Sequence, residues 1–349
     1  MSAPDRINDR INDRINDRLA MPLPATIAEA IALEMERDPA IVCVGEDIGR
    51  AGGVFGTTRG LQERFGRDRV LDAPIAEMGF TGMGVGLAQA GMRPLIEIMF
   101  VDFVGVCLEQ MYNAAAKIPY MSGGRQRMPI VFKTAGGCIG SAAQHSQCLW
   151  GLFAHLPGFK VVAPCNPHDH KGLMAAALRS DDPVVFIEHK ALLLQKGRDF
   201  RHHPDVPAEA YTLPIGQAAV VREGSDVTLA TLSATVEHAL AAAEELAGEG
   251  VSVEVIDLRS VVPLDTATVA ESAARTGRLL VVDEDYLSFG LSAELTLRVI
   301  EALGHGALRQ TARLAVPDVP IPAALSLERA VVPNAALIAE RLRAMAKGA

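Results

Sequence analysis

The segment DAPIAEMGFTGMGVG, residues 72–86, places one carboxylate, Glu77, between a proline-containing loop and a glycine-rich helix. Each glycine inside a helix costs up to about 1 kcal/mol relative to alanine, and this helix has glycines at positions 79, 82, 84 and 86. We therefore expect another backbone or a cofactor to approach the helix closely, with Glu77 facing a ligand. The alternative is that Glu77 only stabilises the positive end of the helix dipole.

A second candidate is His145, in the glycine-rich stretch TAGGCIGSAAQHSQC at 134–148. This stretch follows a predicted strand and leads into a predicted helix. The dipole of a helix N-terminus favours the neutral imidazole, which can act as a base or a hydrogen-bond donor near neutral pH. The alternative is a structural histidine whose ring nitrogens both bond to backbone groups.

Phe100 and Phe103 follow the predicted strand RPLIEIMF, residues 93–100. Open parallel sheets bind ligands at the carboxyl ends of their strands, so these rings can line a site. The alternative is that both rings belong only to the core. The G-x-G-x-G spacing at 82–86 does not match a dinucleotide fingerprint, and the sequence contains no Walker-type phosphate loop.

These residues need an alternating α/β scaffold to position them. Further strands are predicted at 41–44, 129–133, 159–164 and 183–188, with helices near 78–90, 104–117, 146–155 and 168–179. A T-x-x-E capping box at Thr26 and Glu29 predicts the start of an earlier helix. The strands are apolar on both faces, which indicates a parallel sheet covered by helices on both sides.

A second α/β series follows a linker that lacks hydrophobic periodicity. It begins with a predicted hairpin at 218–232, and further strands are expected at 251–259, 278–285 and 312–318. Helices are expected at 234–247, near 265–276 and 291–303, and from about Ala335. We predict a domain at 24–190, a linker at 191–212 and a smaller domain at 213–349.

Composition limits the class of protein. The chain of 349 residues is 49% hydrophobic and carries a net charge of −9, which argues against general nucleic-acid binding. No apolar run is long enough to span a bilayer, so we expect no membrane insertion. The five cysteines form no CxxC pair, and we expect a cytoplasmic protein without disulfides. Residues 1–23 carry three DRIN repeats and are expected to be either disordered or an amphipathic helix.

Taken together, residues from about 24 to 190 and from about 211 to 342 resemble a known family. The resemblance is to the β subunit of the thiamine-diphosphate-dependent first component of acetoin and 2-oxo acid dehydrogenase complexes. The matching text is GEDIG, DAPIAEMGFTGMGVG, AAKIPYMSGG, AAQHSQ, PGFKVVAP and DLRSVVPLD. The wording EIMFVDFVGVC is most similar to the acetoin-cleaving branch. The resemblance implies two doubly wound α/β domains: a transketolase-like pyrimidine-binding domain and a transketolase C-terminal-like domain.

The resemblance also assigns roles to residues. Glu77 matches the acid that bonds the aminopyrimidine ring of thiamine diphosphate and activates the cofactor. His145 matches the family's active-site histidine, which serves substrate addition or acylation of the lipoyl group. Phe103 and Ile75 match neighbours of the pyrimidine ring. Glu46 and Glu109 match acids that line a channel between paired active sites.

Metal sites and partners are implied in the same way. Some members bind K⁺ through carbonyl oxygens at positions that match Ile130, Ala177, Leu178 and Asp182, although Ser180 stands where those members usually have aspartate. Mg²⁺ and the cofactor diphosphate need a GDG motif, which this chain lacks. The resemblance therefore implies an α subunit that binds both, a heterotetramer of two α and two β subunits, and docking onto a lipoyl acyltransferase core.

We therefore predict the β subunit of an enzyme that cleaves acetoin and passes the acyl group to lipoamide. Pyruvate or branched-chain 2-oxo acids are alternative substrates for the same family. Two different alternatives are a catalytically silent docking subunit and a complete transketolase-like enzyme on one chain, although the second needs the diphosphate motif that is missing.

Overall fold

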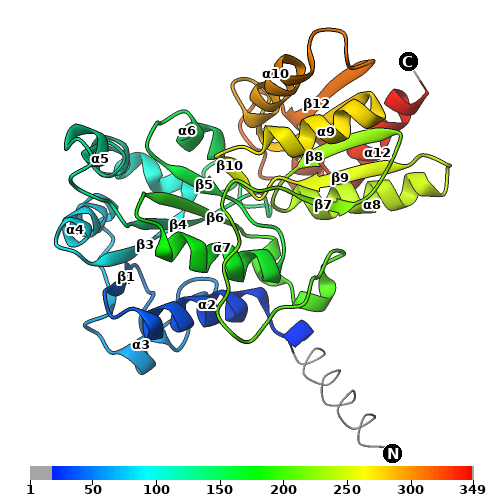
Figure 1. Ribbon diagram of the computed structural model, residues 1–349. Coiled ribbons are helices and arrows are strands. Elements are labelled where there is room, and N and C mark those ends of the chain that lie inside the picture. Colours follow the sequence, from blue (N-terminus) through cyan, green and yellow to red (C-terminus); the bar gives the residue numbers. More distant parts are fainter. Residues whose placement is uncertain (1–17, 348–349) are drawn as a thin grey trace, which may run out of the picture.

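The computed structural model describes residues 18–347, which form two α/β units (Figure 1). The predicted helix or disorder in the DRIN repeats falls on residues 1–17, outside the described residues. Within residues 18–347, no helix is both long enough and apolar enough to cross a bilayer.

The first unit is built on a seven-stranded sheet with the order β10-β5-β6-β4-β3-β1-β2. Its strands are parallel except β10, which pairs antiparallel with β5. The strands are β1 (Ile41–Gly45), β2 (Val70–Asp72), β3 (Arg93–Phe100), β4 (Val131–Gly136), β5 (Lys160–Val162), β6 (Val184–His189) and β10 (Ser260–Val262).

Alternate side chains of these strands enter two different cores. On β3, Leu95 packs in one core and Ile96 and Ile98 in the other. Helices α2 (Leu23–Arg37) and α7 (Pro167–Arg179) cover the Leu95 face, together with the short α3 (Leu61–Phe65). The opposite face is covered by α4 (Glu77–Gln89), η1 (Val101–Val106), η2 (Glu109–Ala115) and α6 (Trp150–Ala154). The predicted parallel sheet with helices on both sides is therefore confirmed.

The second unit contains a five-stranded sheet with the order β12-β11-β8-β9-β7. Its strands are β7 (Ala219–Arg222), β8 (Val227–Thr231), β9 (Val253–Asp257), β11 (Arg278–Tyr286) and β12 (Gln310–Val316). Helices α8 (Thr235–Ala247) and α12 (Ala335–Ala346) pack on one face, and α9 (Thr266–Thr276) and α10 (Leu291–Leu303) pack on the other. A short helix, α11 (Leu325–Val331), precedes α12.

Four local predictions are wrong. The helix predicted near 146–155 covers only Trp150–Ala154, so His145 lies in an irregular segment and not at a helix N-terminus. The predicted hairpin does not form, because β7 pairs with β9 and β8 lies between β9 and β11. The predicted capping box fails because α2 begins at Leu23, with a proline in its first turn, so that Thr26 is buried inside the helix. The predicted helix at 104–117 is instead a 3₁₀ segment, η1, followed by a π segment, η2.

The two units share structure as well as a linker. Strand β10 comes from the C-terminal part of the chain, yet it forms the edge of the first sheet. Arg259, next to it, makes a bidentate ion pair with the fully buried Asp169 of α7, with both N–O distances at 2.8 Å. The linker also packs on α7, since Lys171 donates to the carbonyls of Pro207 and Ala208. The domain boundary at residue 213 stays a prediction.

The glycines of α4 have different surroundings. A Cβ built on Gly84 would lie 2.5 Å from Ile96 Cδ1 and 2.6 Å from Ile96 Cγ1, because this turn of α4 lies directly on β3. A Cβ on Gly86 would meet nothing within 4 Å, and one on Gly79 only the Ala76 side chain at 3.8 Å. Close approach of α4 to β3 therefore explains why position 84 needs a glycine. No contact within this chain explains the glycines at the exposed positions 79 and 86.

We expect Gly84→Ala and Gly86→Ala to change stability in opposite directions. The Gly84→Ala methyl group overpacks the fully buried Ile96 and should cost about 1–3 kcal/mol in the free energy of unfolding. Gly86→Ala should stabilise the chain by up to about 1 kcal/mol through helix propensity. Urea unfolding of the purified variants measures both, and equal effects would contradict this account of α4.

Candidate active site

The candidate site lies where the first sheet reverses its strand order. The chain passes from β1 to β2 on one side and returns to β3 on the other side of β1. Such a switch point opens a crevice at the carboxyl ends of the flanking strands, which is where open α/β sheets bind ligands. Glu46 follows β1 directly, Phe100 ends β3, and the segment that carries His145 follows β4.

Glu77 and Glu46 lie within electrostatic range of each other. Glu77 is half-buried in the first turn of α4, whereas Glu46 is buried. Burial raises the pKa of the Glu46 carboxyl, and the charges of Glu77 and Asp47 raise it further. A carboxyl group with a raised pKa can share a proton with a weakly basic ligand atom.

Unpartnered oxygens lie on the segments that leave the sheet at this switch point. Among the described residues, three buried side-chain oxygens on the segments that follow β1 and β3 have no hydrogen-bond partner: Glu46 Oε1, Asp102 Oδ2 and Gln110 Oε1. Buried polar atoms are normally satisfied, so these acceptors fit a ligand that carries N–H groups.

His145 and Phe103 are brought together, as part of an aromatic cluster. The ring centroids of His145 lie 5.5 Å from Phe103 and 5.6 Å from Phe100, in each case edge to face. Phe100 also contacts Phe103 at 5.6 Å and Phe55 at 6.1 Å. Both Phe103 and His145 are half-buried, so part of each residue stays accessible to a ligand.

Lys190 is a neighbour of His145 that the sequence analysis missed. It follows β6, is 1% exposed, and donates a short hydrogen bond from Nζ to the His145 carbonyl. Its ammonium group lies 5.1 Å from the centre of the Phe100 ring. Burial lowers the pKa of Lys190, and the charge of Asp102 opposes that shift. The sequence feature that could have identified Lys190 is the charged triplet EHK, residues 188–190, at the end of an apolar strand.

A buried charge network joins three adjacent strands of the first sheet. Lys133 on β4 donates to Glu97 on β3 at 2.9 Å and lies 3.0 Å from Glu188 on β6. It also donates to Thr57 at 2.8 Å, which ties the loop after β1 to the sheet. Burial raises the pKa of Glu188 to about 7, against the lowering effect of Lys133. The network fixes the segments that carry the candidate site.

Ile75 lies beside the crevice in an exposed apolar surface. It is 85% exposed, although the sequence analysis places it against a ligand. Exposed apolar side chains continue along α4, η1 and α5 (Ile118–Met121): Met78, Met83, Val106, Tyr120 and Met121. In Figure 1, α4 and α5 lie at the end of the molecule away from the second unit. Apolar patches of this kind mark protein–protein interfaces.

The remaining predicted residues lie apart from this cluster. Glu109 is exposed on η2 and accepts a hydrogen bond from Asn113 at 2.6 Å. The positions predicted for potassium lie at the amino ends of the strands, opposite the switch point: Ile130 precedes β4, Asp182 precedes β6, and Ala177 and Leu178 lie in the last turn of α7.

Cationic side chains already contact the predicted potassium positions. Arg93 donates to the carbonyl oxygens of Leu178 at 2.9 Å and Ser180 at 2.6 Å. Lys160 lies 2.9 Å from Asp182 Oδ2. In this arrangement the segment does not fit a potassium ion, and the potassium site stays a prediction.

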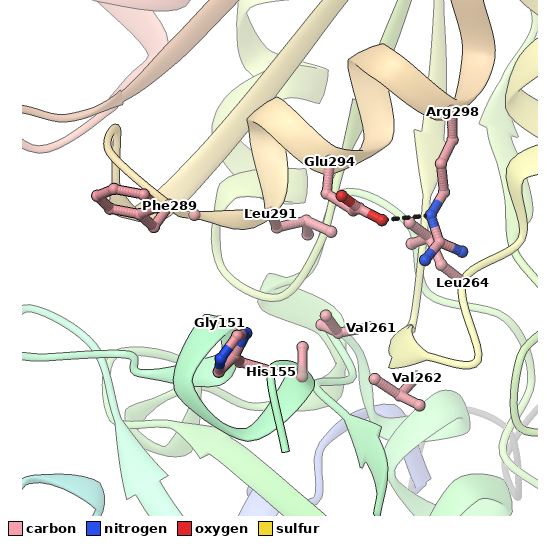
Figure 2. Close-up of a pocket in the computed structure, with 11 residues that line it drawn as sticks. Gly151, His155, Val261, Val262, Leu264, Phe289, Leu291, Glu294 and Arg298 are labelled. Atoms are coloured by element: carbon pink, nitrogen blue, oxygen red, sulfur yellow. Dashed lines mark hydrogen bonds and ion pairs between the residues drawn. The ribbon is translucent and has the colours of Figure 1, made fainter. Parts of the chain in front are cut away.

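A separate pocket of ≈ 280 Å³ lies between the two units. Figure 2 shows that Gly151 and His155 line one side, while Leu291, Glu294 and Arg298 line the other. Glu294 and Arg298 pair with each other at 2.7 Å. The lining residues do not include the predicted site residues, and the pocket lacks the unpartnered oxygens found at the switch point.

Comparisons with known proteins agree with this division of the chain. Residues 20–195 match the family model described as the transketolase pyrimidine binding domain. Residues 216–338 match the transketolase C-terminal domain. Among solved structures, a split-gene transketolase described as an inactive β4 tetramer has a TM-score of 0.74 at 21% identity, covering 93% of this chain and 98% of that chain.

Curated relatives are more similar in sequence. The chain is 44% identical to the β subunit of acetoin:2,6-dichlorophenolindophenol oxidoreductase from Cupriavidus necator, covering 92% of this chain and 96% of the relative. It is 44% identical to a pyruvate dehydrogenase E1 β subunit of Arabidopsis thaliana, covering 87% and 84%. It is 42% identical to the 2-oxoisovalerate dehydrogenase β subunit of Bacillus subtilis, covering 91% and 96%.

We expect Lys133→Met to lower the free energy of unfolding by about 3–5 kcal/mol, because it leaves Glu97 and Glu188 buried without their cation. The matched control is Lys160→Met, which breaks the exposed pair with Asp182 and should cost less than about 1 kcal/mol. Denaturant unfolding of both variants tests this difference, and similar costs would show that the buried network does not stabilise the sheet.

Proposed function

Because the chain belongs to the family of β subunits of thiamine-diphosphate-dependent 2-oxo acid dehydrogenases, we propose that it forms, with an α subunit, an enzyme that cleaves acetoin and passes the acyl group to lipoamide. One observation carries the assignment of the site. Glu77 begins a glycine-rich helix beside the buried Glu46 and its unpartnered oxygen. This is an acid at a switch point, next to an exposed apolar surface.

We propose that this crevice holds the pyrimidine half of the cofactor. When bound, thiamine diphosphate supplies the carbanion chemistry that protein side chains lack. In our proposal, Glu77 holds or releases a proton at its carboxylate against the pyrimidine ring, with Glu46 beside it. Phe103 and Ile75 provide the apolar contacts, and the unpartnered oxygens at the crevice accept N–H donors.

His145 is proposed to act on the substrate. Its imidazole is half-buried in the aromatic cluster, where Phe100 and Phe103 restrict water on one side. An imidazole in that position can donate or accept a proton at the substrate oxygen or at the lipoyl group. Lys190 bonds to the His145 backbone and so fixes the base of the side chain.

The α subunit is proposed to cover the exposed apolar surface along α4 and α5. This surface adjoins Ile75 and Glu77, so a partner seated there would close the crevice. We propose that this partner holds Mg²⁺ and the diphosphate, because the chain has no GDG motif. A tetramer of two α and two β subunits, docked on a lipoyl acyltransferase core, completes the proposal.

Sequence identity does not separate the substrates. The acetoin and pyruvate relatives are both 44% identical to this chain, and the 2-oxoisovalerate relative is 42% identical. The preference for acetoin rests on the sequence EIMFVDFVGVC, residues 97–107. Pyruvate and branched-chain 2-oxo acids are the alternatives within the same family.

We expect Glu77→Gln to lower turnover of the α/β complex at least about a hundredfold, because the amide cannot exchange a proton. The matched control is Glu63→Gln, an exposed acid on α3, which should retain activity. Turnover is measured with an artificial electron acceptor. Full activity of Glu77→Gln would favour a catalytically silent docking subunit.

The substrate is tested with the complex of this chain and its α subunit. We expect the highest kcat/KM with acetoin when acetoin, pyruvate and 3-methyl-2-oxobutanoate are compared. A higher value for either 2-oxo acid would transfer the assignment to that branch. Turnover by this chain alone would contradict the shared site.

A further inference from the structure

The segment that carries His145 has little regular structure of its own. Residues 137–149 connect β4 to α6 without forming a helix or strand. Ala142 and Leu149 both adopt the left-handed region, with φ of 61° and 54°. Non-glycine residues in that region are strained and persist only where surrounding contacts determine the backbone. The Gly137 N–H donates to the Gln147 carbonyl within the segment at 2.8 Å, and the remaining contacts that hold it come from groups outside it.

Acidic side chains of the second unit hold the segment ahead of His145. Glu284, on β11, accepts a hydrogen bond from the Cys138 backbone N–H at 2.8 Å. Glu328, on α11, accepts from the Gly140 N–H at 2.9 Å and 3.1 Å through its two oxygens. Both carboxylates are more than nine-tenths buried. A carboxylate bonded to a backbone N–H makes a charge-assisted hydrogen bond, roughly twice as strong as a neutral one.

The same strand holds the segment after His145. Asp283 accepts from the Trp150 indole N–H at 2.8 Å, and Asp285 accepts from the Gly151 N–H at 3.0 Å. Three consecutive acids of β11 and one acid of α11 thus bracket His145 from both sides, across the boundary between the two units.

Glu284 is itself fixed by a buried histidine. The Ala191 N–H donates to His189 Nδ1 at 3.2 Å, so the ring proton lies on Nε2, which is 2.9 Å from Glu284. Burial alone would raise the pKa of Glu284, but the neighbouring His189 and the Cys138 N–H bring it below its ordinary value. Ligand atoms of Cys148, His189 and Glu284 lie within 4.8 Å of one another, but both imidazole nitrogens are already engaged, which does not favour a metal there.

Helix α11 also touches the segment directly. A Cβ built on Gly140, which has φ of +78°, would lie 2.7 Å from the Leu325 side chain. Leu325 is 52% exposed, so this contact adds little to the core of the second unit. The contact between Leu325 and Gly140 therefore mainly restricts where the segment around Gly140 can lie.

We infer that Glu328 and Glu284 are positioning residues for His145, so that the second unit sets the place of the active-site imidazole through hydrogen bonds to the Cys138 and Gly140 backbone. This inference rests on the proposed function, because it requires His145 to act on the substrate. Neither carboxylate is assigned any contact with substrate or cofactor.

A double-mutant cycle in the α/β complex tests the inference. We expect Glu328→Ala to lower kcat by about tenfold to a hundredfold, the scale of a small misplacement of a reacting group, with thiamine diphosphate affinity unchanged within about twofold. In a His145→Ala background the same change should lower the residual rate less than about twofold, because the residue acts through His145. Glu328→Gln should recover most of the activity, since its amide oxygen accepts the Gly140 N–H.

Two further variants distinguish an effect on His145 from a general loss of folding. Leu325→Ala removes the other contact of α11 with Gly140 from an exposed position, and its effect on kcat should also vanish in the His145→Ala background. Glu301→Ala, an exposed acid on α10, serves as the control and should leave kcat unchanged.

The inference is overturned if Glu328→Ala or Leu325→Ala lowers kcat by the same factor with and without His145, or if both leave kcat unchanged. The proposed function fails in a different way: the unmodified complex would then turn over none of the three substrates, or His145→Ala would retain full activity.

Discussion

Backbone N–H groups that are removed from water must find acceptors, and this requirement governs the candidate site. A strand or helix satisfies its own backbone, but the irregular segment between β4 and α6 does so only in part, through the bonds from Gly137 N–H to Gln147 O and from His145 N–H to Ala142 O. Further acceptors come from Glu284 and Glu328 of the second unit, and from Asp102, which accepts from the Gln147 N–H at 3.2 Å. Loops that carry function are commonly fixed by a rigid scaffold, and here the scaffold includes both sheets.

Most of the fold could be predicted because its signals are local. The runs at 93–100 and 183–188 are apolar on both faces, and they became central parallel strands. The terminal helix begins at Ala335, as expected from its periodicity. The hairpin at 218–232 could not be judged locally, because insertion of β8 between β9 and β11 is decided by packing of distant segments.

The same distinction applies to the candidate site. Glu77, Glu46, Phe103 and His145 follow strand ends, which is a local feature. In the structure Glu77 lies near Glu46, and Phe103 lies near His145. Lys190, Glu284 and Glu328 come from distant parts of the chain and meet His145 or its segment only after both units have packed. Three consecutive acids at 283–285 are unusual at the end of an apolar strand. Nothing in the sequence indicates that they contact residues 138–151.

Strand β10 gives the architecture a consequence for biosynthesis. Residues 260–262 complete the edge of the first sheet beside β5, although they are made about a hundred residues after that strand. Until they emerge from the ribosome, the backbone of β5 has an open side that another chain could pair with. A fragment that ends in the linker would lack β10 and keep the β5 edge unpaired. The first unit is therefore unsuited to expression without the second unit.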